Sequence, residues 1–300
     1  SNGTGFNQFD HFNVSSGQSA TLVLPTGTNN LVNLIRDQAT INGAVKSVLG
    51  TVGGQIGGNV FLVVPSGLII GATGSIDTGR LIVRGTYAKP SAGDPSPADV
   101  FGGDPAQNVT INGRVSAPGG VDIAGRNVIV GASGRVETGA AALARIGNTA
   151  ALQNSLVSMQ GLPSGQAIVS TASGGIAIVG ESISLAGKIA DNPATPANEA
   201  QPGALLDARP VTGSLALPGG ISLDAPTLGI GGQIIAWDGT SSGPAGDITL
   251  TASDSETYGG LFNGQSPFFG MPKANAGINI SGAIRGGTVT ANAAASSNTN

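Results

Sequence analysis

The heptapeptide VTINGRV at residues 109–115 places apolar side chains at its first, third and seventh positions and glycine at its fifth. The same order recurs in ATINGAV (39–45), ISLAGKI (183–189), LGIGGQI (228–234) and INISGAI (278–284). Alternation with a period of two is typical of a strand that buries one face. The glycine marks a bend of the backbone at a corner. The repeat therefore predicts short strands joined by corners.

Successive copies of the repeat begin 70, 74, 45 and 50 residues apart. These gaps are near multiples of about 24 residues, a spacing within the range of stacked repeats, and predict about ten coils. Two further segments, GATGSIDTG (71–79) and GASGRVETG (131–139), resemble each other, and each follows an apolar run. Stacking like residues above like indicates an all-β protein, a parallel β-helix (β-solenoid). A β-sandwich or barrel is the alternative, but the Asn-Gly pairs at 42–43 and 112–113 lie inside the repeat, where they predict corners.

Composition limits the classes of protein that the chain can belong to. Fifty glycines and seventeen prolines in 300 residues disfavour long helices, because the two residues cost about 1 and about 3 kcal/mol there relative to alanine. A net charge of −4 without any basic run disfavours nucleic-acid binding. The absence of cysteine excludes disulfides and thiolate metal sites, and it suits a chain that crosses a membrane unfolded.

The sequence predicts one domain over residues 1–300. Phe6, Phe9 and Phe12 are expected to plug the N-terminal end of the solenoid as a cap. A helix is plausible only within residues 140–160, where Leu152, Leu156 and Met159 follow a helical spacing. The polar tail suggests that the native chain continues past residue 300. The expected parts are a cap over 1–30, coils over 31–290 with excursions near 88–106 and 190–212, and a flexible tail over 291–300.

Residues that could carry catalysis are sparse. His11 is the only histidine, and without a Gly-x-Ser-x-Gly elbow it is expected to be a capping or surface residue. Asp247, Asp254 and Glu256 form the closest group of acids, but their spacing does not match a calcium loop. Sugar-binding platforms are few, since the chain has one tryptophan and two tyrosines. We therefore expect no enzyme activity, no catalytic residue, no metal site and no cofactor.

Three segments follow one another in a fixed order near the N-terminus. They are FNQFDHFNVSSGQSATL (6–22), NNLVNLIRDQATINGAV (29–45) and GNVFLVVPSGLIIGATGSIDTGRLIV (58–83). This order resembles the two-partner secretion domain of filamentous-haemagglutinin-like exoproteins, whose signature is F-L-I-N-P-N-G-I-x-F-G. The segment Phe61 to Gly71 keeps the Phe, Leu, Pro and both Gly of that signature and departs from it at both asparagines, where Val64 and Ser66 stand.

The resemblance implies a right-handed β-helix with an N-terminal cap. It also implies recognition in the Gram-negative periplasm by the POTRA domains of an Omp85-type outer-membrane transporter (TpsB-type), followed by export as an unfolded chain and folding outside the cell. The chain would then be the secretion domain of a large secreted or cell-surface adhesin, and it would be a monomer. The residues expected in the secretion motif are Asn33, Asn42, Gly43, Val64, Pro65, Ser66, Gly67 and Leu68.

Other interpretations of these features stay open. Phe61, Val63, Leu68 and Ile70 could simply fill the core, while Pro65 and Gly67 set a turn. The domain could belong to a cytolysin or contact-dependent toxin that uses the same route, or the chain could be a β-helix polysaccharide-processing enzyme. Binding of a host receptor, glycan or exopolysaccharide is expected mainly from regions downstream of residue 300.

Overall fold

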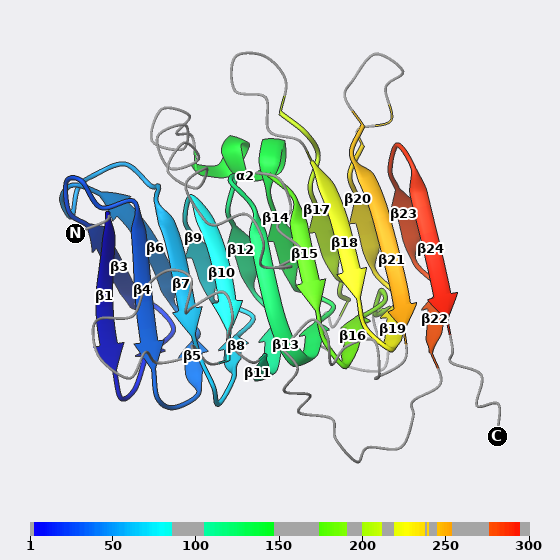
Figure 1. The fold of residues 1–300 in the computed structure, drawn as a ribbon, viewed down its shortest axis with the longest axis horizontal. Helices are drawn as coiled ribbons and strands as arrows, with labels where there is room; N and C mark the ends of the chain where they lie inside the picture. The colour runs from blue at the N-terminus through cyan, green and yellow to red at the C-terminus, as the bar shows by residue number, and fades with distance from the viewer. Residues whose placement is uncertain are drawn as a thin grey trace.

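The computed structural model describes residues 3–85, 105–146, 174–190, 200–211, 219–237, 239, 245–253 and 276–294. Their strands wind into a parallel β-helix, with the N-terminus at one end of the solenoid and the C-terminus at the other (Figure 1). All pairings between named strands are parallel, and each coil contributes one strand to each of three sheets, A, B and C. The predicted all-β solenoid is confirmed.

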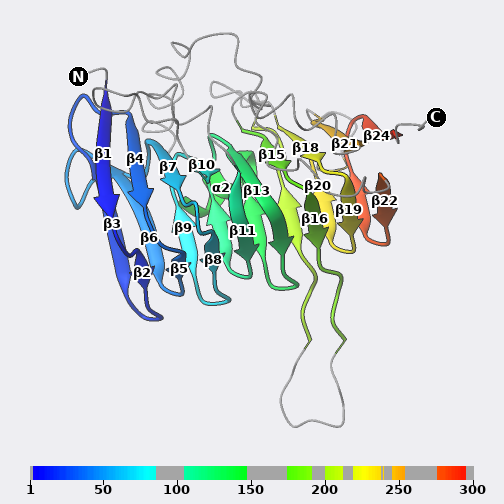
Figure 2. The same ribbon diagram turned by 60° about the horizontal axis from the view of Figure 1, so that its bottom comes forward.

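The three sheets run the length of the solenoid (Figure 2). Sheet A contains β1 (Thr4–Phe9), β4 (Asn30–Ile35), β7 (Asn59–Val63), β10 (Arg80–Arg84), the first part of β13 (Val121–Val130), β15 (Ile176–Val179), β18 (Gly220–Asp224), β21 (Asp247–Ser253) and β24 (Val289–Ala294). Sheet B contains β2 (Asn13–Val14), β5 (Ala39–Ile41), β8 (Leu68–Ile70), β11 (Ala106–Ile111), the second part of β13, β16 (Ser182–Leu185), β19 (Thr227–Ile230) and β22 (Gly277–Ile280). Sheet C contains β3 (Ser19–Leu24), β6 (Ala44–Leu49), β9 (Ser75–Asp77), β12 (Arg114–Ser116), β14 (Arg135–Glu137), β17 (Leu205–Asp207), β20 (Gln233–Ile235) and β23 (Ala283–Arg285).

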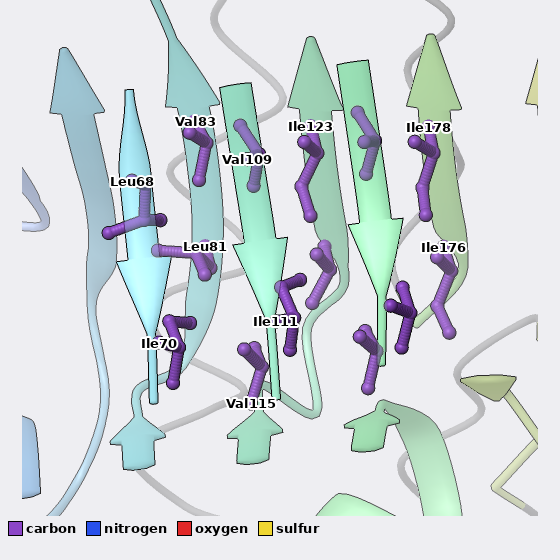
Figure 3. Close-up of a cluster of buried hydrophobic side chains, with 14 of the residues drawn as sticks. Leu68, Ile70, Leu81, Val83, Val109, Ile111, Val115, Ile123, Ile176 and Ile178 are labelled. Atoms are coloured by element: carbon purple, nitrogen blue, oxygen red, sulfur yellow. The ribbon is translucent and has the colours of Figure 1, made fainter. Parts of the chain in front are cut away.

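The core consists of columns in which one apolar side chain lies above another. In sheet B, Ile41, Ile70, Ile111 and Val130 are successive partners, and all four are buried. Figure 3 shows such side chains from neighbouring strands pointing into the same interior. Burying one side chain of this size stabilises the fold by about 1.5–3 kcal/mol, so the third position contributes strongly in every heptad except the last, where Ile280 is 44% exposed.

The described residues form eight complete coils, because eight strands of sheet C are described, whereas the spacing predicted about ten. Excursions from the coils lengthen several repeats, so dividing the length by a constant period overestimates the number. Residues 291–294 were expected in a flexible tail, but they belong to β24, which pairs with β21.

The N-terminal segment expected as a cap is itself the first coil. Its strands β1, β2 and β3 pair in parallel with β4, β5 and β6. Phe12 is buried, and its ring meets Phe9 edge to face with centroids 5.1 Å apart. Phe6 lies on the outer face of sheet A and is 36% exposed. Two of the three phenylalanines therefore contribute to the core, and the third does not.

Phe61 and Val63 of β7 were expected to fill the core, but the neighbouring residues of the strand face it instead. Val60, Leu62 and Val64 belong to the main core cluster, whereas Phe61 and Val63 belong to a separate buried cluster with Val32 and Ile82. Because alternate residues of a strand point to opposite faces, this second cluster lies on the outer face of sheet A. Leu68 and Ile70 do lie in the core, as expected.

The heptad at 183–189 gives way to an excursion at its last position. Ile189 was expected to face the core, but it is 48% exposed and forms an antiparallel bridge with Gln201. Leu206 of β17 takes the inward place and lies beside Val136. The excursion expected over 190–212 therefore does not include β17, which belongs to sheet C.

Smaller features interrupt the solenoid elsewhere. Val48 and Ile56 form an antiparallel bridge that closes a hairpin between β6 and β7, which the sequence did not reveal. Most of the excursion expected over 88–106 lies outside the described residues, although Ala106 already begins β11.

The helix α2 (Gly139–Ile146) begins close to the expected helical region, but Leu152, Leu156 and Met159 lie outside the described residues. In the described part of the chain, no helix is long and apolar enough to span a membrane.

Candidate functional site

The signature turn Pro65-Ser66-Gly67 joins β7 to β8 at the corner between sheets A and B in the third coil. The Gly67 amide donates to the Val64 carbonyl at 2.9 Å, which closes the turn. Gly67 has φ of +101°, a left-handed conformation that glycine tolerates far better than other residues. Pro65 and Ser66 are exposed, whereas Gly67 is buried. The turn therefore presents two side chains to solvent on a backbone that the glycine defines.

Backbone hydrogen bonds fix this turn between the neighbouring coils. On one side, the Ala39 amide donates to the Gly67 carbonyl at 3.0 Å. On the other side, the Gln107 amide donates to the Pro65 carbonyl at 3.2 Å. The position of the turn thus depends on correct stacking of the second, third and fourth coils.

The equivalent corners of the first two coils lie beside the turn, and together the three make a surface that we name the N-terminal corner: Asp10 and His11, Arg36 and Asp37, Pro65 and Ser66. Arg36 Nη1 lies 2.9 Å from Asp10 Oδ1, and His11 Nδ1 lies 2.7 Å from Asp37 Oδ2. The Ser66 hydroxyl donates to the Arg36 carbonyl at 3.2 Å. Since the Asp10 and Arg36 side chains are 67% and 73% exposed, their ion pair adds little stability and leaves both groups accessible to a partner.

A hollow of about 240 Å³ adjoins the N-terminal corner on the outer face of sheet A. Leu34 and Val63 give it an apolar part, while Asp10 and Arg36 give it a charged part. Its size suits one or two side chains of a partner rather than a drug-sized ligand. The residues that line it are Gln8, Phe9, Asp10, Leu34, Ile35, Arg36, Val63, Pro65 and Gly85.

The other residues expected in the motif do not join this surface. Asn33 points into the core and is fully buried, where it accepts from Asn7 Nδ2 at 2.9 Å and donates to the Phe61 carbonyl at 3.2 Å. Val64 and Leu68 also lie in the core. Asn42 and Gly43 form the corner between sheets B and C, at the other end of β5 from the N-terminal corner. Of the expected set, only Pro65, Ser66 and Gly67 belong to the turn at the N-terminal corner.

Three residues of this surface were missed from the sequence: Asp10, Arg36 and Asp37. The signal that could have found them is positional, because Arg36 follows Asp10 by 26 residues and Pro65 follows Arg36 by 29, close to one coil each time. The antiparallel hairpin after β6 changes the length of that repeat, so the equivalence becomes visible only once the coils are stacked.

Two residues that were considered as catalytic candidates, His11 and Asp247, form contacts between neighbouring coils. The exposed His11 pairs with Asp37 and so links the first two coils. Asp247 Oδ1 accepts from the Thr288 amide at 3.0 Å, while Asp254 and Glu256 lie outside the described residues.

Acidic side chains on the outer face of sheet C were not singled out from the sequence, and each is paired with an arginine. Asp207 binds Arg209 through both carboxylate oxygens, and Asp77 lies 3.1 Å from Arg145. Among the described residues, no group of three or more His, Cys, Asp or Glu side chains could hold a metal ion.

These features define a cysteine-free parallel β-helix domain with a distinctive exposed turn in its N-terminal coils. The profile of the TPS secretion domain matches residues 1–196, so the chain belongs to this family of two-partner secretion domains. Comparisons with curated proteins and with solved structures gave no significant match. Membership implies export across the outer membrane as a secreted exoprotein with a TpsB transporter as partner, and such domains are typical of non-enzymatic adhesins or exoproteins.

Proposed function

We propose that this chain is the secretion-targeting domain of a large adhesin, and that the POTRA domains of a TpsB-type transporter recognise it in the periplasm of a Gram-negative bacterium. The observation that carries the proposal is the match to the TPS secretion domain, together with the exposed Pro65-Ser66 turn in the family signature. The final location of the protein is then the cell surface or the medium. The domain acts as a monomer, and contacts to a host receptor or glycan come from regions downstream.

The burial of the motif supports recognition in two parts. Asn33, Val64 and Leu68 are buried in the folded solenoid, so a transporter can contact their side chains only before the coils form. Pro65 and Ser66 remain accessible in both states. Folding therefore removes most of the motif from contact and favours release of the chain on the outer side of the membrane.

The connectivity of the solenoid supports folding from one end. Each coil pairs only with its neighbours, as for β4 between β1 and β7, so a formed coil is the template for the next. The first coil already contains its own buried residues, including Phe12 and Val14. The proposal is that this N-terminal end nucleates the fold as it emerges from the transporter, and that each added coil opposes backward movement.

The test alters the exposed part of the turn without altering its backbone. Pro65→Ala with Ser66→Glu is expected to leave the fold intact and to lower the amount of protein in the medium at least about tenfold, the effect of losing one well-placed contact. Secretion of the tagged domain is measured in cells that contain its transporter, with folding checked by circular dichroism of the purified variant.

The matched control is Ala72→Glu, which changes an exposed residue at the other corner of the same coil. It is expected to be secreted like the wild type. Equal secretion of the turn variant and the control would show that the exposed turn is not part of the address. If the double variant folds poorly, Ser66→Arg alone decides the question, because it retains Pro65 and Gly67.

A further inference from the structure

Three charged side chains are buried on the outer face of sheet A where the fourth coil meets the fifth. Arg80 and Arg84 lie at the two ends of β10, and Asp122 lies on β13. Arg80 and Arg84 are each 5% exposed and Asp122 is 2% exposed. Charged side chains are rarely buried to this degree without a partner, because removing a charge from water is costly. None of the secretion features described above involves these three residues.

The geometry joins the three residues into one network. Arg80 Nε donates to Asp122 Oδ2 at 3.0 Å, and Arg80 Nη2 donates to the same oxygen. Arg84 Nη1 donates to the carbonyls of Val83 at 2.8 Å and of Asp122 at 3.3 Å. Burial lowers the pKa of the Arg84 guanidinium, Asp122 partly offsets this effect, and Arg80 adds to it. Asp122 is thus the carboxylate that makes two buried arginines tolerable at this place.

The apolar columns do not distinguish one coil from the next. Val83 pairs with Ile123, whose next partner in the column is Ile178, and these side chains have similar volume and shape (Figure 3). A chain that skipped the fifth coil would place Ile178 against Val83 with little loss of packing. The entropy of closing a loop grows only slowly with its length, so chain length also discriminates weakly.

The outer column that contains Asp122 does distinguish the coils. Its described members in the neighbouring strands are uncharged, so only β13 offers a carboxylate to Arg80 at this level. Those other members are Phe6, Val32, Phe61, Ile82, Ala177, Ser222, Thr249 and Thr290.

We propose that the Arg80–Asp122 ion pair selects β13 as the strand that follows β10 in the sheet, and so prevents the folding chain from skipping a coil. Arg80 and Asp122 are 42 residues apart, whereas Asn59 and Arg80, which are Cα partners in the preceding pair of coils, are 21 apart. The pair thus lies where the next strand of sheet A is far away in the sequence. A buried ion pair of this kind contributes specificity of register more than net stability, because an unpaired buried charge penalises every alternative partner.

The experiment uses the absence of native cysteines to report register. Val83→Cys with Ile123→Cys joins neighbouring strands and is expected to form a disulfide in the correct fold, because parallel partners lie within disulfide range. Val83→Cys with Ile178→Cys spans two coils and can be linked only when a coil is skipped. The domain that contains the three substitutions Val83→Cys, Ile123→Cys and Ile178→Cys is refolded from denaturant under oxidising conditions. The peptides linked through each of the two possible disulfides are then quantified by mass spectrometry.

The apolar replacement of the whole network, Arg80→Met and Arg84→Met with Asp122→Leu, is expected to raise the yield of the skipped-coil disulfide about tenfold over the wild-type background, since it removes the discriminating charges and leaves no buried charge unpaired. The exposed pair is the control: Asp10→Asn with Arg36→Gln is expected to leave that yield unchanged. A folded apolar variant with a wild-type yield would overturn the proposal. If the apolar variant does not fold, the exchanged pair Arg80→Asp with Asp122→Arg decides: recovery of native register relative to either single exchange supports the proposal, and a defect equal to the single exchanges overturns it.

Discussion

Replacement of Gly67 by alanine is expected to destabilise the folded domain by about 3 kcal/mol, the sum of backbone strain and a steric clash. The strain arises because Gly67 has φ of +101°, which a residue with a Cβ rarely adopts. The clash arises because a Cβ at this position would lie 2.5 Å from the carbonyl oxygen of Asn108. That oxygen belongs to the backbone of β11 in the next coil, so it cannot move without disturbing the sheet.

Urea unfolding followed by circular dichroism measures this effect, with Gly53→Ala as the matched control. Gly53 is exposed, and a Cβ there would meet no atom within 4 Å. The control is expected to unfold at the wild-type urea concentration, and Gly67→Ala at a clearly lower one. Identical midpoints for the two variants would mean that the turn does not depend on its glycine, contrary to the geometry described here.

Phe61→Ala is expected to lower the free energy of unfolding by about 3–5 kcal/mol, the usual cost of truncating a fully buried phenylalanine. Phe61 opens the family signature, yet its side chain packs on the outer face of sheet A beside Val32, Val63 and Ile82. Its role in the folded domain is therefore packing between three consecutive coils, through its partners Val32 and Ile82. Phe61→Leu restores much of the volume and is expected to recover more than half of the loss.

The measurement is again the unfolding midpoint, now compared with Val52→Ala. Val52 is 68% exposed in the hairpin after β6, and its truncation is expected to change stability by less than about 0.5 kcal/mol. A Phe61→Ala protein as stable as the Val52→Ala protein would contradict the outer cluster. This comparison also separates the packing role of the signature from its proposed recognition role. Phe61→Ala is expected to lower both stability and secretion, whereas the Ser66 variants are expected to lower secretion alone.

The sequence predicted the fold well because the strand pattern is local. In VTINGRV, the alternation of apolar and polar residues predicts that Val109 and Ile111 face inward and that Thr110 faces outward. The structure buries Val109 and Ile111 and stacks them on apolar partners in the neighbouring coils. The same reasoning failed at Ile189, because whether a chain continues its coil or leaves it depends on the strand that returns later. Leu206, which replaces Ile189 in the column, lies 17 residues further along.

The site was predicted less completely than the fold. The Pro65-Ser66-Gly67 turn was found because glycine and proline have local conformational preferences. Asn33 was expected at the same site, but its neighbours in the first and third coils place it in the core. Partners that lie one coil away, such as Arg36 beside Asp10 or Asp122 beside Arg80, have no signal in a single segment of sequence. Their positions follow only from the number of residues in each coil, which the excursions change.

Export of this domain by a dedicated transporter is tested by measuring its secretion with and without that partner. A tagged domain with a cleavable signal peptide is expressed in a Gram-negative host, with or without a cognate TpsB-type transporter, and the amounts of the domain in the periplasm and in the medium are compared. The protein is expected to reach the medium only when the transporter is present. Retention in the periplasm despite the transporter, or equal release without it, would show that the domain is not exported by this route.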